Sequence, residues 1–344
     1  MVKSTEKDNR TKLWVVMAVL IIVLAVFVVF AVCLGKYPVS AKESLSIICR
    51  GLFGQEQTAE EMTVNVVLRL RLPRILASIL VGAALSLSGA AYQGIFKNPL
   101  VSPDFLGVSS GACIGAAIGI LLGLASAYIS AFAFVGGIIA VLITAALPAF
   151  IKNRSNIMLV LAGIIVSSLM SSIMGYIKYT ADPDTELASI TYWTMGSFSY
   201  VDLRDILAML AIFLIPAAIL ILMSWWIDVM SMGEDEAKAL GANVKLIRGI
   251  SIFCSTLLTA GSVCLAGTIG WVGLIIPHFA RMLVGPSNRK LMPVSCVLGG
   301  LFMLIVDTFT RTIGVEEMPV SIMTGIVGAP FFCWLLFKRR DSIQ

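Results

Sequence analysis

Long stretches without a charged residue constrain this chain more than any other feature of its sequence. A helix rises 1.5 Å per residue, so a crossing of the roughly 30 Å hydrocarbon core of a membrane needs about 20 apolar residues. Six stretches have about this length: residues 13–34, 75–96, 157–177, 206–227, 291–310 (interrupted only by Asp307) and 318–337. Because a helix satisfies its own backbone hydrogen bonds in lipid, the chain is predicted to be an all-α polytopic membrane protein.

Two further charge-free stretches are too long for one ordinary crossing. The first, residues 105–151, contains 47 residues, and a turn near residues 123–126 is expected to divide it into two spans. The second, residues 249–280, contains 32 residues, with a break expected at residues 267–270. If both stretches are divided, the chain has ten spans and its two termini lie on the same side of the membrane.

The positions of the basic residues favour ten spans over nine. With ten, 16 of the 25 Lys and Arg residues lie inside and nine outside, as the positive-inside rule expects. With nine, most of the basic residues beyond position 280 would lie outside. We therefore predict about ten transmembrane helices in a single domain, residues 1–344, with both termini cytoplasmic and a cytoplasmic N-terminal tail at residues 1–12.

The composition excludes several classes of protein. The chain is 58% hydrophobic and only 13% charged, which excludes a soluble enzyme, a disordered chain and a nucleic-acid binder. It has one histidine and seven scattered cysteines with no CxxC pair, so no metal site is predicted.

Four glycines recur every four residues, at positions 111, 115, 119 and 123. They would form one ridge on a helix, where a neighbouring backbone can approach closely. We favour tight packing over the alternative, a pore lined with bare backbone.

Residues 229–245 connect two predicted spans on the inner side. Glu234 and the acidic residues after it stand where the positive end of a short helix would begin, with Lys238 four residues later, and Gly241 can end that helix. Ala237 and Leu240 are poorly matched to water alone. The segment therefore fits a small cytoplasmic helix that docks on another protein, with an ordinary solvated loop as the alternative.

Motifs along nearly the whole chain identify a family resemblance. They are Arg-Leu-Pro-Arg at residues 71–74, Gly82, Gly89, Gln93, Asn98-Pro99-Leu100, Pro103, Leu106-Gly107, Ser-Ser-Gly-Ala at 109–112, Tyr192-Trp193, Gly196, Gly233-Glu234, Leu240-Gly241, Gly273, Pro277-His278, Pro319 and Gly328-Ala-Pro330. In this order they resemble the membrane permeases of type II ABC importers for iron chelates, haem and cobalamin. Members of that family have ten helices per subunit, in agreement with the independent count.

The resemblance implies how such a permease is driven. Its coupling segment would seat on a cytoplasmic ABC ATPase through Gly233, Glu234, Ala237, Leu240 and Gly241. This chain contains no Walker motif G-x-x-x-x-G-K-[ST]. ATP and Mg²⁺ would therefore be bound by the partner, and this chain is expected to carry no cofactor and to be no enzyme.

The resemblance also implies two contact regions at the membrane faces. On the outside, Arg71, Arg74 and Arg311 would receive acidic residues of an extracytoplasmic substrate-binding protein, since a guanidinium can hold a carboxylate through two hydrogen bonds. Anchoring to lipid headgroups is the alternative. On the inside, a cytoplasmic gate would consist of Asn98, Pro99, Leu100, Ser155 and Asn156.

Asp307 and Arg311 lie four residues apart on one helical face, a spacing that allows a salt bridge. A carboxylate within the membrane is costly and is a functional candidate by default. We interpret the two residues as a structural membrane pair; the alternative is an ion-binding carboxylate. His278 fits a satisfied helix-end donor better than a metal ligand.

The sequence therefore predicts the permease of an ATP-driven importer in the cytoplasmic membrane of a bacterium or archaeon. Its partners would be ABC ATPases, a binding protein, membrane lipid and a second permease copy or paralogue. We expect a ferric siderophore or another iron complex as cargo, with haem, cobalamin and molybdate as alternatives. An ion-coupled secondary transporter is the competing hypothesis, and a membrane-embedded enzyme has few residues to work with.

Overall fold

The computed structural model describes residues 2–151, 156–314 and 316–340, and every regular element in that part of the chain is a helix. The helices are α1 (Val2–Cys33), α2 (Ala41–Leu52), α3 (Glu61–Asn65), the π-helical η1 (Val66–Arg71), α4 (Leu72–Phe96), the 3₁₀ turn η2 (Pro103–Leu106), α5 (Val108–Leu121), α6 (Ser126–Phe150), α7 (Asn156–Thr180), α8 (Glu186–Met195), α9 (Leu203–Met232), α10 (Glu234–Ala239), α11 (Val244–Ala266), α12 (Val272–Val284), α13 (Asn288–Thr312) and α14 (Val320–Arg340). The predicted all-α membrane fold is confirmed.

The expected spans fall on ten apolar helices of unequal length. In the described part of the chain, seven helices are long and apolar enough to cross a membrane, and three shorter apolar helices lie at Val108–Leu121, Val272–Val284 and Val320–Leu335. Both predicted interruptions are confirmed, since α5 and α6 are separate helices and so are α11 and α12. The three short helices lack the length of a full crossing, so ten complete spans are not established.

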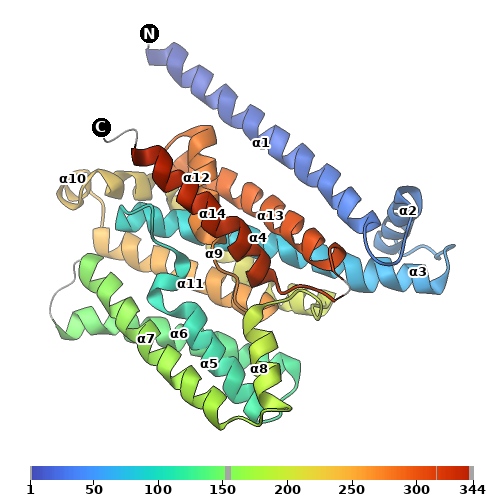
Figure 1. The fold of residues 1–344 in the computed structure, drawn as a ribbon. Helices are drawn as coiled ribbons and strands as arrows, with labels where there is room; N and C mark the ends of the chain where they lie inside the picture. The colour runs from blue at the N-terminus through green and yellow to red at the C-terminus, as the bar shows by residue number, and fades with distance from the viewer. Residues whose placement is uncertain (1, 152–155, 315, 341–344) are drawn as a thin grey trace.

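Different segments of the chain lie at the two ends of the helix bundle (Figure 1). The beginning of α1, the end of α14 and the short helix α10 lie at one end, whereas α2 and α3 lie at the opposite end. The arrangement agrees with termini on one side of the membrane. Residues 2–12, predicted as a tail, are helical and continuous with the apolar part of α1.

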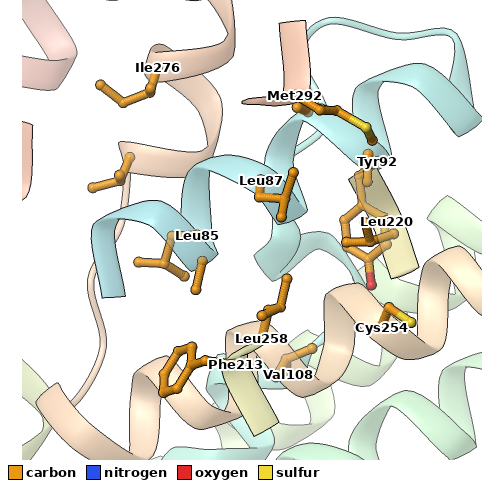
Figure 2. Packing of buried hydrophobic residues seen from close by; sticks show 14 of the residues in the cluster. Leu85, Leu87, Tyr92, Val108, Phe213, Leu220, Cys254, Leu258, Ile276 and Met292 are labelled. Carbon is orange, nitrogen blue, oxygen red and sulfur yellow. The ribbon is translucent and has the colours of Figure 1, made fainter. Parts of the chain in front are cut away.

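Helix α4 forms the centre of the bundle. It packs against α9, α11, α12 and α13, and Figure 2 shows its Leu85, Leu87 and Tyr92 among side chains of these neighbours. In contrast, less than a third of the most apolar segment of α1, α6, α7 and α9 is buried. Apolar faces of this kind suit lipid, so the described chain has a protein-like interior around α4 and a lipid-facing periphery.

Glycines let helices in the interior approach at backbone distance. A Cβ at Gly89 of α4 would lie 1.8 Å from the carbonyl oxygen of Gly273 in α12, and one at Gly82 would lie 2.2 Å from the carbonyl oxygen of Gly299 in α13. The glycine ridge of α5 behaves in the same way, because Gly111 abuts the backbone of α6 at Gly136. The structure therefore supports packing over a bare pore for this ridge, although Gly123 lies in the turn after α5 and not on the ridge.

Two interruptions bring non-helical backbone into the bundle. After α4 ends, residues 97–107 lead through η2 to the start of α5, and residues 267–271 separate α11 from α12. Lys97 and Trp271, one in each interruption, are the non-glycine residues with a left-handed backbone in the described chain. Such backbone is tolerated at membrane depth only where protein or water surrounds it. The two interruptions meet, because Pro103 packs against Gly273 at the start of α12.

The close contact between α4 and α12 gives a stability prediction. Gly89→Ala would force the two helix backbones apart, and overpacking of this kind costs about 1–3 kcal/mol. We expect the melting temperature of the purified chain in detergent to fall by several degrees. The matched control is Gly249→Ala in α11, where a Cβ meets nothing within 4 Å. Equal melting temperatures for the two variants would contradict the packing.

Candidate functional site

A buried charge cluster joins the outer ends of several helices. The Arg74 guanidinium of α4 donates to the Asp307 carboxylate of α13 at 2.8 Å and to Glu317 at 2.7 Å. Asp307 is fully buried, while the side chain of Glu317 is 40% exposed. Ser199, before α9, accepts from Arg74 and donates to Glu317. Buried charges need such pairing, so the cluster fixes α4, α13 and two connecting segments relative to one another.

Two other arginines satisfy the C-terminal end of α1. The last carbonyl groups of a helix have no partner within it, and cations are favoured there by the helix dipole. Arg71 donates to the carbonyl oxygen of Val32 at 2.7 Å and to that of Cys33 at 3.3 Å, and it also bonds Tyr37. Arg311 donates to the carbonyl oxygen of Ala31. These guanidinium groups anchor α1 to the bundle.

The predicted pair within α13 is therefore corrected. Asp307 bonds directly to Arg74, 233 positions away in sequence, and not to Arg311, whose guanidinium points to α1. The i, i+4 spacing placed Asp307 and Arg311 on one face, but Arg74 offers a guanidinium at hydrogen-bond distance from both carboxylate oxygens. The structural interpretation of Asp307 stands, with a different partner. A carboxylate within the membrane favoured an ion-binding site, but the Asp307 carboxylate is already paired with Arg74, which weakens that alternative.

The three arginines predicted to receive a binding protein are not exposed. Arg71, Arg74 and Arg311 are only 5%, 7% and 7% exposed, and all three donate to groups of this chain. Their docking role stays a prediction, and in this conformation it would require exchange of internal partners. Exposed cations of the same end include Arg69 and Arg204.

The predicted coupling segment contains a short helix, α10, at the tip of the bundle (Figure 1). Ala237 is buried, and Glu234 forms a salt bridge with Arg248 of α11, so the helix is fixed to the bundle. Lys238 pairs with Asp235 at 2.9 Å, although Glu234 lies four positions before it. Gly241 has a left-handed φ of 83° and terminates the turn.

Apolar side chains on this tip face outward. Leu240 is 59% exposed and Met232 is 69% exposed, although both lie beside charged residues and beyond the apolar part of α9. The unpartnered apolar surface agrees with a docking helix, and the docking role itself stays a prediction.

The predicted inner gate is partly described. Asn98 accepts from the backbone N–H of Leu100 at 2.9 Å, which fixes the turn, and the imidazole Nε2 of His278 lies 3.0 Å from the carbonyl oxygen of Pro99. His278 is thus a satisfied helix residue of α12. Asn156 begins α7. Ser155 lies outside the described residues. Whether these residues gate anything stays a prediction.

Sequence reasoning named Gln93 only as part of a family motif and did not predict its contacts, and it missed Asp228. Gln93 accepts from Arg281 at 2.9 Å and donates to the carbonyl oxygen of Leu274 at 3.3 Å, joining α4 to α12. The Asp228 carboxylate of α9 accepts from the hydroxyl of Ser287 at 2.8 Å and from the N–H of Asn288 at 2.6 Å. A carboxylate is favoured at a helix N-terminus, so Asp228 caps α13 from another helix. No sequence spacing indicated this contact.

Sequence reasoning also missed Asp104 in η2. It accepts hydrogen bonds from Ser109 and, at 3.4 Å, from Ser102, and it borders two cavities. Within the ranges that the structure describes, no three His, Cys, Asp or Glu side chains come together as a metal site would require. The expected absence of a metal and a cofactor remains a prediction.

Comparisons with known proteins agree with this geometry. The FecCD transport family matches residues 21–338. The molybdate import permease MolB of Haemophilus influenzae is 37% identical over 321 residues, covering 93% of this chain and 95% of the relative. A Helicobacter pylori permease named for iron chelatin transport is 38% identical over 278 residues, covering 80% and 83%. A solved inward-facing metal-chelate type ABC transporter is 36% identical with a TM-score of 0.84, covering 94% and 98% of the two chains. Relatives named for haemin and cobalamin import also match.

The buried cluster predicts a large effect of removing one partner. Asp307→Asn would leave the Arg74 guanidinium without its buried counter-charge, and breaking a buried ion pair costs about 3–5 kcal/mol. We expect Asp307→Asn and Arg74→Gln each to lower the melting temperature of the isolated chain sharply. Glu316→Gln, on an exposed neighbour of Glu317, is the control. A melting temperature equal to that of the control would show that the cluster is not structural.

Glu317 gives this end of the bundle a pH dependence. Partial burial alone would raise the pKa of Glu317, but hydrogen bonds from Ser199 and Arg74 outweigh burial and hold that pKa below its usual value of 4.5. A lowered folded pKa means stability that is present above pH 4.5 and lost as pH falls through the folded pKa. We expect Glu317→Gln to flatten the loss of melting temperature below pH 4.5. An unchanged acid profile would contradict the assignment.

Proposed function

Because the chain belongs to the FecCD transport family and is an ABC importer permease, we propose that it forms the translocation pathway for an iron complex, driven by a separate cytoplasmic ATPase. The exposed apolar tip at Leu240 carries the proposal, because it offers a fixed apolar surface at the end of the bundle where α1 begins and α14 ends. The chain lacks a Walker motif. ATP and Mg²⁺ would accordingly be bound by the partner, and this subunit would perform no covalent chemistry.

We propose an assembly of two such permeases, two ATPases and one extracytoplasmic binding protein. Large lipid-facing or partner-facing surfaces on α7 and α14 leave room for a second permease copy or a paralogue. Closure of the ATPases would push on α10 and tilt the helices attached to it, a rigid-body switch between outward and inward access. The membrane would be the cytoplasmic membrane of a bacterium or archaeon.

The identity of the cargo is the finer part of the proposal. Relatives are named for molybdate and for iron chelatin, so family membership alone selects none of these. We keep a ferric siderophore or another iron complex as the expected cargo. Reconstitution with the cognate ATPase and binding protein tests the cargo assignment. Iron chelates, haem, cobalamin and molybdate are each tested for stimulation of ATP hydrolysis. Accumulation by vesicles containing this chain alone under a proton or sodium gradient would contradict the ATP-driven function.

The docking tip gives a sharp test of coupling. Leu240→Asp would place a carboxylate in an apolar contact, and loss of a central interface side chain costs 2 kcal/mol or more, on the order of 30-fold in affinity. We expect cargo uptake to fall and ATPase binding to weaken, with the melting temperature of the permease unchanged because Leu240 is exposed. Leu240→Met is the matched control that keeps the apolar contact. Equal uptake by the two variants would remove the coupling assignment.

A further inference from the structure

An open, largely apolar cavity with several polar groups lies beside the first interruption of the bundle. It has a volume of about 560 Å³ and is lined by Ser102 and Asp104 from the η2 turn and by Ser167, Ser168 and Ser171 from α7. Cavities of a few hundred Å³ are large enough to contact a small ligand or part of a larger one. Phe105 and Ile164 complete the lining, so most of the exposed wall is apolar, and four serine hydroxyls and the Asp104 carboxylate are its polar groups.

A second cavity lies on the other side of Asp104. It has a volume of about 260 Å³ and is lined by Ser109, Ser110 and Cys113 of α5 and by residues 268–270 of the second interruption. Asp104 borders both cavities. The carboxylate therefore stands where the two interruptions of the bundle meet, and broken helices are the places where transporters contact their cargo near the middle of the membrane.

Asp104 carries the only acidic or basic side chain in either lining. No salt bridge joins it to a cation within the described part of the chain. Burial raises the pKa of the Asp104 carboxyl above its usual value, and hydrogen bonds from the hydroxyls of Ser109 and Ser102 offset only part of that effect. The N-terminus of α5 lies beside the carboxylate. These donors and the helix dipole, about half an elementary charge, stabilise the anion without cancelling it.

We propose that Asp104 makes these cavities favour cargo that is cationic or rich in hydrogen-bond donors over oxyanions. The inference rests on the proposed function, because it treats the cavities as part of the route for cargo, and it deepens that function by naming a substrate class. A carboxylate among hydroxyls accepts hydrogen bonds from N–H and O–H groups on the surface of a chelate. It repels molybdate or phosphate, whose charge has the same sign.

Cys113 provides a natural reporter, since it lines the second cavity and is partly exposed there. The full chain, assembled with its ATPase in nanodiscs, is treated with either of two membrane-impermeant thiol reagents of similar size. One is cationic, the trimethylammonium-ethyl methanethiosulfonate, and the other is anionic, the sulfonatoethyl methanethiosulfonate. Mass spectrometry of the peptide that contains Cys113 gives the rate of its modification by each reagent, and hence the ratio of the rate with the cationic reagent to the rate with the anionic reagent. No other cysteine needs to be replaced.

We expect Asp104→Asn to lower this ratio at Cys113 on the order of tenfold, and Asp104→Glu to keep it high. Cys49 on α2 is exposed and far along the chain, so its ratio in the same samples serves as the internal control and should not change. An unchanged ratio at Cys113 in Asp104→Asn overturns the inference. So does the absence of reaction at Cys113 with either reagent, because the cavity would then be closed to solutes.

The two proposals fail separately. The thiol ratio needs neither cargo nor ATP, so loss of the Asp104 effect leaves the ATP-driven function standing. Conversely, failure of the Leu240 test removes the ATPase coupling and leaves the charge preference of the cavities measurable. A fold defect is recognised by a changed ratio at Cys49 together with a lowered melting temperature. In that case the Asp104→Glu variant, which retains the charge, tests the inference. A low ratio of cationic to anionic modification at Cys113 in this variant contradicts the inference, and a high ratio supports it.

Discussion

One constraint governs this structure: in hydrocarbon, every backbone N–H and C=O group needs a hydrogen-bond partner within the protein. It makes helices of the charge-free stretches, and it confines irregular backbone to residues 97–107 and 267–271 inside the bundle. There the carbonyl oxygens find internal donors: the N–H of Ser197 bonds the oxygen of Ala266 at 2.9 Å, and His278 lies against that of Pro99. Protein therefore satisfies backbone groups beside both interruptions, and a cavity lined by Asp104 and residues 268–270 lies where the two interruptions meet.

The same requirement explains the arginines at the other end of the bundle. The exposed C-terminal carbonyls of α1 and the buried carboxylate of Asp307 all need donors, and an arginine supplies five N–H groups in a fixed plane. Arg71 and Arg311 serve α1, while Arg74 serves Asp307 and Glu317. Three of the nine basic residues that the predicted topology places outside are thus accounted for by internal hydrogen bonding. A binding protein at this face would find these three arginines already bonded within the chain, with Arg69 and Arg204 exposed.

The sequence predicted what depends on local properties and missed what depends on distant contacts. Runs of apolar residues locate the helices, because hydrophobicity is a property of each segment, and charge and glycine positions indicated α10 and the break before α12. The predicted hydrogen-bond partner of Asp307 was wrong because an i, i+4 spacing relates positions within one helix only. The observed partner, Arg74, lies 233 positions away in the sequence. Asp228 and Asp104 were missed for the same reason: each acquires its surroundings from elements that sequence does not place side by side.

Helix α11 connects the two regions to which we assign function. It begins at Val244, beside α10, and ends at Ala266, beside the break that lines the second cavity. Its 23 residues correspond to a rod of about 35 Å. Glu234 is bonded to Arg248 at one end of this rod, and the backbone of Ala266 is bonded to Ser197 at the other. Since a packed helix moves as a unit, a force that the proposed ATPase applied to α10 would be delivered to residues 267–271 and hence to the wall of the cavity that Asp104 lines. In the proposed function, one rigid element would thereby link docking to passage, without a chain of small side-chain movements.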